Sequence, residues 1–144
     1  MERVSKRNYY LDIAQTVLER ATCLRRVYGA IIVKNDEIIS TGYNGAPRGR
    51  KNCVDLGYCT REQLKVPRGE RYELCRSVHA EANAIISAQR RDMVGASIYL
   101  VGRDARSGEL RRDSAHDGAL ERVAVAAAAE DRDHAAAAEA AHGF

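Results

Sequence analysis

His79 and Glu81 are the two residues of this chain whose types and spacing best support a chemical reaction. A hydrolytic zinc site needs a neutral imidazole as a metal ligand and a carboxylate beside the metal-bound water. Zinc lowers the pKa of that water to about 7, so hydroxide is available at neutral pH, and the carboxylate can carry its proton to a leaving group. The pair therefore predicts metal-assisted hydrolysis, with His79 as zinc ligand and Glu81 as proton carrier.

A His-x-Glu triplet is weak evidence by itself, because a lone histidine in a helix is more often a surface or core residue than a ligand. The local sequence adds a helix. Ser77 is a good N-cap, and an alanine-rich run follows it, so His79 and Glu81 are expected in the first helical turn. There the helix dipole would favour an anionic hydroxide. The interpretation then depends on the rest of the chain.

Four stretches of the chain resemble the deoxycytidylate (dCMP) deaminase family, in the order in which that family has them. They are CLRRVYGAIIV at 23–33, IISTGYNGAP at 38–47, ELCRSVHAEANAI at 73–85 and ASIYL at 96–100. The resemblance runs from about Ser5 to about Leu110. The chain also resembles a member of the same family, the deaminase-like protein of bacterial competence operons. It implies the cytidine/deoxycytidylate zinc-deaminase superfamily and its fold, a three-layer α/β/α cytidine-deaminase-like sandwich with a mixed β-sheet.

The resemblance implies zinc-dependent hydrolytic deamination of dCMP to dUMP, a reaction of pyrimidine deoxynucleotide metabolism. In the implied mechanism His79 binds the catalytic zinc, the metal hydroxide attacks C4 of cytosine, and Glu81 carries the proton to N3 and then to the leaving amine. Asn44 resembles the family's substrate-binding asparagine, whose amide can donate to a sugar hydroxyl and accept as well. Because family members often form hexamers, a homo-oligomer is also implied.

The second half of the family's zinc signature, Pro-Cys-x-x-Cys, is absent. By the family's spacing it would fall at 116–120, where the sequence is HDGAL. His116 could stand in as a ligand, Asp117 is at best a weak oxygen ligand, Leu120 has no donor atom, and no cysteine follows Cys75. Catalytic zinc sites usually have three protein ligands. We therefore expect little zinc at His79 and deaminase activity near background.

The incomplete signature leaves other interpretations open. One is a non-catalytic deaminase-fold protein that keeps a nucleotide-binding pocket or an interaction surface. Another is a tRNA or nucleoside deaminase, although the cysteine-bearing insertion between Asn44 and Cys75 looks like the nucleotide branch. The third is a defective product, because a shifted reading frame near Arg111 would also explain the alanine-rich ending.

The cysteines form a second candidate metal site. All four precede the predicted His79 helix, at Cys23, Cys53, Cys59 and Cys75. Structural disulfides are rare in cytosolic proteins, whereas four thiolates can hold a structural zinc that would order the long loop between them. Some dCMP deaminases carry such a second zinc in this region, so the resemblance supports it. The alternative is free or partly buried thiols, because the spacings contain no Cys-x-x-Cys pair.

Composition limits the class of protein. A chain of 144 residues with 45% hydrophobic and 30% charged residues fits one globular domain. No apolar run approaches the roughly 20 residues that span a bilayer, and the N-terminus has no signal-peptide stretch, so a cytoplasmic protein without a membrane partner is expected. The net charge of +3 does not require a nucleic-acid partner. A few arginines could hold a nucleotide phosphate, since arginine suits bidentate phosphate contact.

Periodicity predicts the elements that position these residues. The predicted elements are a helix at 8–22, a hairpin of strands at 28–33 and 37–41, a long loop at 43–76 with a short helix near 61–64, the His79 helix, and a strand at 97–101. The order α-β-β-α-β is typical of an α/β sandwich with a mixed sheet. We expect a deaminase domain at 1–110. Residues 111–144 have few large apolar side chains and are expected to be a weakly anchored, alanine-rich segment.

Overall fold

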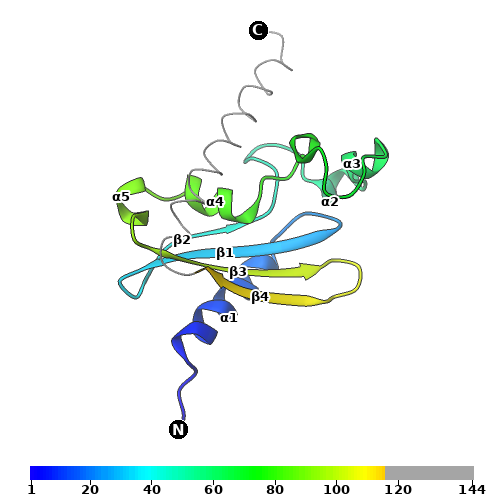
Figure 1. Cartoon of the computed structure of the whole chain (residues 1–144). Helices are drawn as coiled ribbons and strands as arrows, with labels where there is room; N and C mark the ends of the chain where they lie inside the picture. Colours follow the sequence, from blue (N-terminus) through cyan, green and yellow to red (C-terminus); the bar gives the residue numbers. More distant parts are fainter. Residues whose placement is uncertain (116–144) are drawn as a thin grey trace.

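The computed structural model describes residues 1–115, and they form an α/β/α sandwich (Figure 1). The strands are β1 Arg26–Lys34, β2 Glu37–Tyr43, β3 Ser97–Asp104 and β4 Leu110–Ala115, in the order β2-β1-β3-β4. The helices are α1 Lys6–Leu18, α2 Cys53–Leu56, α3 Thr60–Gln63, the 3-10 helix η1 Tyr72–Leu74, α4 Ala80–Ile86 and α5 Arg90–Met93. Helix α1 lies on one face of the sheet and α4 on the other, which confirms the predicted three layers.

A mixed sheet was expected, and within residues 1–115 every pairing between strands is antiparallel. Strands β1 and β2 form a tight hairpin whose turn residues, Asn35 and Asp36, both have positive φ, at 52° and 62°. Only residues 105–109 join β3 to β4. Parallel neighbours need a crossover of about a dozen residues or more, so this short connection imposes the antiparallel pairing.

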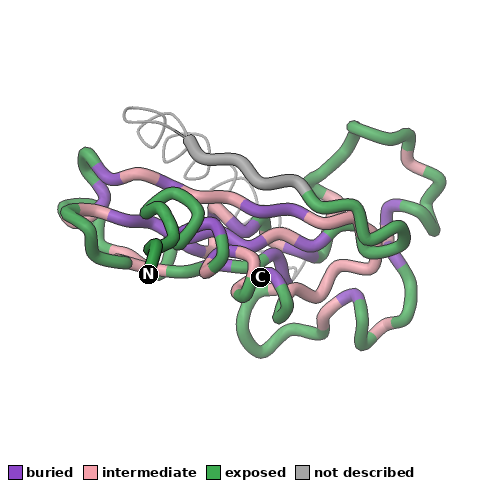
Figure 2. The backbone as a smooth tube through the Cα atoms, turned by 90° about the horizontal axis from the view of Figure 1, so that it is seen from below, coloured by how far each residue is buried: buried purple, intermediate pink, exposed green. Residues whose placement is uncertain are grey.

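Strand β1 is buried on both faces and divides the core in two. Ile31 packs with α1, and Ile32 packs with α4, because successive side chains of a strand point to opposite faces. Helix α1 contributes its buried residues at helical spacing: Tyr10, Leu11, Ala14 and Leu18. Figure 2 shows the burial concentrated along the strands, with the connecting loops largely exposed.

Glycine lets α4 approach the sheet closely. A Cβ added at Gly42 of β2 would lie 2.9 Å from the Ala84 Cα and still closer to the Ala84 nitrogen and the Ala80 oxygen. These are backbone atoms of α4, which cannot rotate away as a flexible side chain would. The absence of a side chain at Gly42 therefore sets the height of α4 above the sheet.

The predicted elements are present with shifted ends. Helix α1 begins at Lys6 instead of residue 8, because the Ser5 hydroxyl accepts a hydrogen bond from the Asn8 N–H at 3.2 Å. Helices α2, η1 and α5 and strand β4 were not predicted from the sequence, and β4 continues the sheet to Ala115. In the described part of the chain, no helix is long and apolar enough to cross a membrane.

Candidate active site

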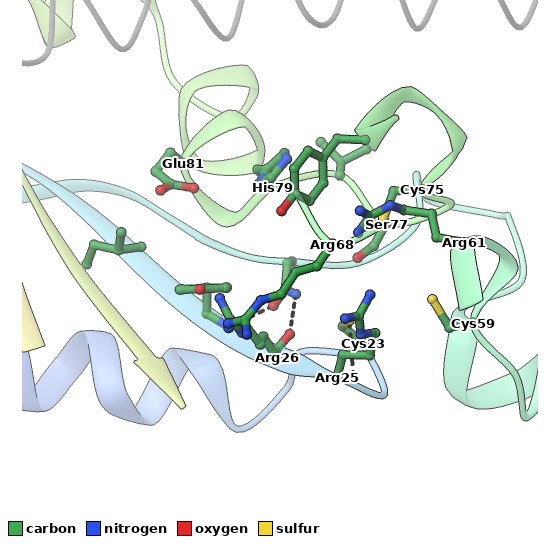
Figure 3. Close-up of a pocket in the computed structure, with 15 residues that line it drawn as sticks. Cys23, Arg25, Arg26, Cys59, Arg61, Arg68, Cys75, Ser77, His79 and Glu81 are labelled. Atoms are coloured by element: carbon green, nitrogen blue, oxygen red, sulfur yellow. Dashed lines mark hydrogen bonds between the residues drawn. The ribbon is translucent and has the colours of Figure 1, made fainter. Parts of the chain in front are cut away.

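A cavity of about 340 Å³ lies between the start of α4, strand β1 and the loop from Asn44 to Val78 (Figure 3). It brings together residues from distant parts of the sequence. His79 and Glu81 occupy the α4 side, and Arg25 and Arg26 the β1 side. The cavity is large enough for a small-molecule ligand.

The start of α4 differs from the prediction. Ser77 is not the N-cap; that position belongs to His79, at φ −61° and ψ 150°. The reason is tertiary: Val78 is held extended by two backbone hydrogen bonds to Gly45, of 2.7 and 3.1 Å, so the helix cannot begin at Ser77. Glu81 remains in the first turn, where the helix dipole stabilises its carboxylate.

His79 and Glu81 both line the cavity, and their roles as zinc ligand and proton carrier stay predictions. The Tyr72 ring lies beside the imidazole, with ring centroids 6.0 Å apart. Asn83, which the sequence analysis missed, positions this corner, because its amide donates to the Tyr43 carbonyl at 2.8 Å and so ties α4 to the end of β2. The feature of the sequence that could have identified Asn83 is a polar asparagine inside a short alanine-rich helix.

Asn44 is placed at the cavity, but its amide already has partners in the fold. The side chain is 7% exposed, its oxygen accepts from the Tyr28 N–H at 2.7 Å, and its nitrogen donates to the Arg26 carbonyl at 2.8 Å. One N–H and one lone pair of the amide stay free for a ligand. Its first role is therefore to join the end of β2 to the start of β1.

Four arginines line the cavity, and two of them are engaged by protein groups. Arg61 is 5% exposed, donates twice to the Glu70 carbonyl at 2.7 and 3.2 Å, and stacks on the Tyr72 ring at 4.1 Å. Arg25 forms an ion pair with Glu62 at 3.0 Å. Arg61 could not be identified from the sequence, because only the path of the loop from 43 to 76 brings it to the cavity.

The four cysteines gather in one region of the structure. Cys23, Cys59 and Cys75 line the cavity, and all four are free thiols. Burial raises the pKa of the Cys53 thiol, and the neighbouring Cys23, Cys75 and Cys59 raise it further. Burial also raises the pKa of Cys75, which the nearby Arg61 partly opposes.

These donors do not complete a metal site within residues 1–110, whose side chains the structure describes. No group of three or more His, Cys, Asp or Glu side chains there is arranged to hold a metal ion. On the α4 side, His79 and Glu81 offer one imidazole and one carboxylate, fewer than the three protein ligands usual for catalytic zinc. The residues at 116–120, where the missing Pro-Cys-x-x-Cys would fall, lie outside the described part of the chain. The structural zinc on the four cysteines stays a prediction.

An α/β/α sandwich with His-Ala-Glu at the start of a helix facing a cavity is the arrangement of a deaminase-like hydrolase. The family model described as "Cytidine and deoxycytidylate deaminase zinc-binding region" matches residues 4–103. The chain therefore belongs to the cytidine and deoxycytidylate deaminase family, as the sequence predicted, and zinc binding is a property of that family's domain.

Relatives and solved structures agree with this assignment. The chain is 36% identical over 98 residues to a deoxycytidylate deaminase of Schizosaccharomyces pombe, covering 68% of this chain but only 30% of that protein. It is 38% identical over 105 residues to that of Mycobacterium phage D29, covering 69% and 80%, and 32% identical over 102 residues to the Bacillus subtilis ComE operon protein 2, covering 69% and 49%. The dCMP deaminase of cyanophage S-TIM5, solved with dCMP and dUMP, shares the fold, with a TM-score of 0.50 at 24% identity over 69% of this chain and 67% of that one.

Proposed function

We propose that this chain binds dCMP in the cavity and deaminates it hydrolytically to dUMP. The observation that carries the proposal is the composition of the cavity: an imidazole and a carboxylate at the start of α4 face arginines on β1 and on the loop. The carboxylate suits proton transfer to a pyrimidine ring nitrogen, and the arginines suit an anionic nucleotide. The curated relatives described above as deoxycytidylate deaminases support the same substrate.

The roles of the site residues follow from their positions. Glu81 would carry the proton between water, N3 and the leaving amine. Asn44 would offer its remaining N–H to the sugar, while holding β1 and β2 together. Tyr72, beside His79, would supply an aromatic wall for the base. We derive no step through zinc, because the described donors do not complete its site.

The start of α4 offers fewer metal ligands than a catalytic zinc site needs, which favours a second candidate function: nucleotide binding without turnover. This candidate keeps the cavity and its arginines and needs no metal at His79. The homo-oligomer and the cytoplasmic location expected from the sequence stay predictions under both candidates.

One set of measurements separates the two. Purified full-length chain is assayed for zinc by elemental analysis, for dCMP binding by calorimetry and for dUMP release by chromatography. Turnover that Glu81→Gln abolishes without loss of folding or zinc supports deamination, because an amide keeps the shape of the carboxylate but cannot shuttle a proton. Glu37→Gln, an exposed change at the start of β2, is the matched control.

The other outcomes are equally informative. Binding of dCMP without release of dUMP, at background zinc, supports the second candidate. Unchanged turnover in Glu81→Gln would show that Glu81 does not have the assigned role, and absence of dCMP binding would contradict both candidates. A tRNA substrate assayed in parallel tests the tRNA-deaminase alternative, for which we expect no activity.

A further inference from the structure

The loop segment 44–46 connects one wall of the cavity with the start of α4. Asn44 begins this segment and lines the cavity. The next residue, Gly45, exchanges two backbone hydrogen bonds with Val78, of 2.7 and 3.1 Å, and Val78 directly precedes the N-cap of α4. The position of His79 relative to Asn44 therefore depends on how firmly this segment is held.

Two residues outside α4, Asn52 and Thr22, hold the same segment. The side-chain oxygen of Asn52 accepts hydrogen bonds from the Ala46 N–H and from the Thr22 hydroxyl, both at 3.1 Å. The backbone of Thr22 adds two more. Its N–H donates to the Asn44 carbonyl at 3.1 Å, and its carbonyl accepts from the Val54 N–H at 3.3 Å. Every polar group of Thr22 is thus used in this junction.

The acceptor oxygen of Asn52 is itself held in place. Asn52 is the N-cap of α2, and its N–H donates to the Asp55 carboxylate at 2.9 Å. The junction is also closely packed, because a Cβ added at Gly45 would lie only 3.1 Å from the Thr22 hydroxyl oxygen and 3.6 Å from the Asn52 side-chain oxygen. A small shift of Asn52 is therefore transmitted directly to Gly45.

We propose that Asn52 is a positioning residue, whose side-chain oxygen fixes segment 44–46 and, through Val78, the start of α4. Asn52 does not line the cavity, so it acts without touching a ligand. Loss of the oxygen would release the segment and let Glu81 move relative to Asn44. This inference rests on the proposed function and deepens it, because it names the contact that orients the groups of the proposed reaction.

The test compares Asn52→Ala, which removes the acceptor, with Asn52→Asp, which keeps an oxygen in its place. Amide hydrogen exchange of the full-length chain, followed by NMR, reports the opening of the Gly45–Val78 bonds without any substrate. Loss of one or two hydrogen bonds should make these two amides exchange about five- to thirtyfold faster in Asn52→Ala, and Asn52→Asp should return them to within about twofold of the wild type. The Ile31 amide in β1 should change less. Ser5→Ala is the matched control, because it removes the side-chain acceptor of one backbone N–H at the N-cap of α1.

A second variant and a rate measurement extend the test. Thr22→Val keeps the shape of the side chain without its hydroxyl, so it serves if Asn52→Ala does not fold. We expect the Gly45 and Val78 amides to exchange about two- to fivefold faster in Thr22→Val, and Thr22→Ser to restore them. In Asn52→Ala the kcat of any dUMP release should fall about ten- to a hundredfold, while the dissociation constant of dCMP changes less than about threefold, because misplacement of Glu81 slows the chemical step.

The possible outcomes separate this inference from the proposed function. Equal acceleration at Gly45, Val78 and Ile31 in Asn52→Ala would show a loss of global stability alone and would overturn the positioning role. The same conclusion follows if Ser5→Ala accelerates the Gly45 and Val78 amides as much as Asn52→Ala does. Exchange as fast in Asn52→Asp as in Asn52→Ala would remove the role from the side-chain oxygen. If the wild type releases no dUMP, the proposed deamination fails, whereas the exchange rates still decide whether Asn52 fixes the start of α4.

Discussion

Substitution of Gly42 by alanine tests the contact that holds α4 above the sheet. The new Cβ would lie 2.9 Å from the Ala84 Cα and nearer still to two other backbone atoms of α4, whereas ordinary contact begins at 3.4 Å. Helix α4 must therefore retreat by roughly 1 Å to bring the nearest of these atoms to ordinary contact. Overpacking of this kind costs about 1–3 kcal/mol, and we expect the upper end because the atoms met are backbone.

The displacement should also affect function, because α4 carries Glu81 and begins at His79. A shift of about 1 Å in a catalytic group can cost about a hundredfold in rate, so any dUMP release should fall by more than the loss of folded protein explains. Urea denaturation measures the stability, with Thr41→Ala, an exposed change on the same strand, as the control. A free energy of unfolding within about 0.5 kcal/mol of that control would refute the close contact between α4 and β2.

Three further predictions follow from the described contacts. Asn44→Ala should lower the free energy of unfolding by about 2–3 kcal/mol in urea, because it leaves two backbone groups of β1 unpaired. The hydrogen bond to Asp36 and burial raise the pKa of Tyr10 to about 12. The contribution of the Tyr10 hydroxyl to the free energy of unfolding is therefore present below pH 10 and is lost as the pH rises from 10 to 12. The difference in the free energy of unfolding between the wild type and Tyr10→Phe should shrink over that range. Cys53→Ser and Cys75→Ser should each lower zinc content and increase proteolysis of the loop at 43–76, and full zinc retention in both would remove the structural site.

The regular elements were largely predictable, because their signals are local. The β-branched run of β1 and the turn that follows it predicted the hairpin, and the helical spacing of Leu18 and its neighbours predicted α1. The predictions were wrong where a contact with a residue far away in the sequence sets the end of an element. Helix α4 begins after His79 because Val78 bonds to Gly45, a contact that no local preference of Ser77 reveals.

By itself, the sequence determined which chemistry the chain can offer. Residue identity establishes an imidazole at 79, a carboxylate at 81 and no thiolate after Cys75, and donor chemistry then limits the metal sites. Only the tertiary structure decided which of these groups share a cavity and that Asn44 is engaged by β1. The physical reason is that such contacts depend on the path of the chain between residues far apart in sequence, and periodicity and propensity describe only neighbours.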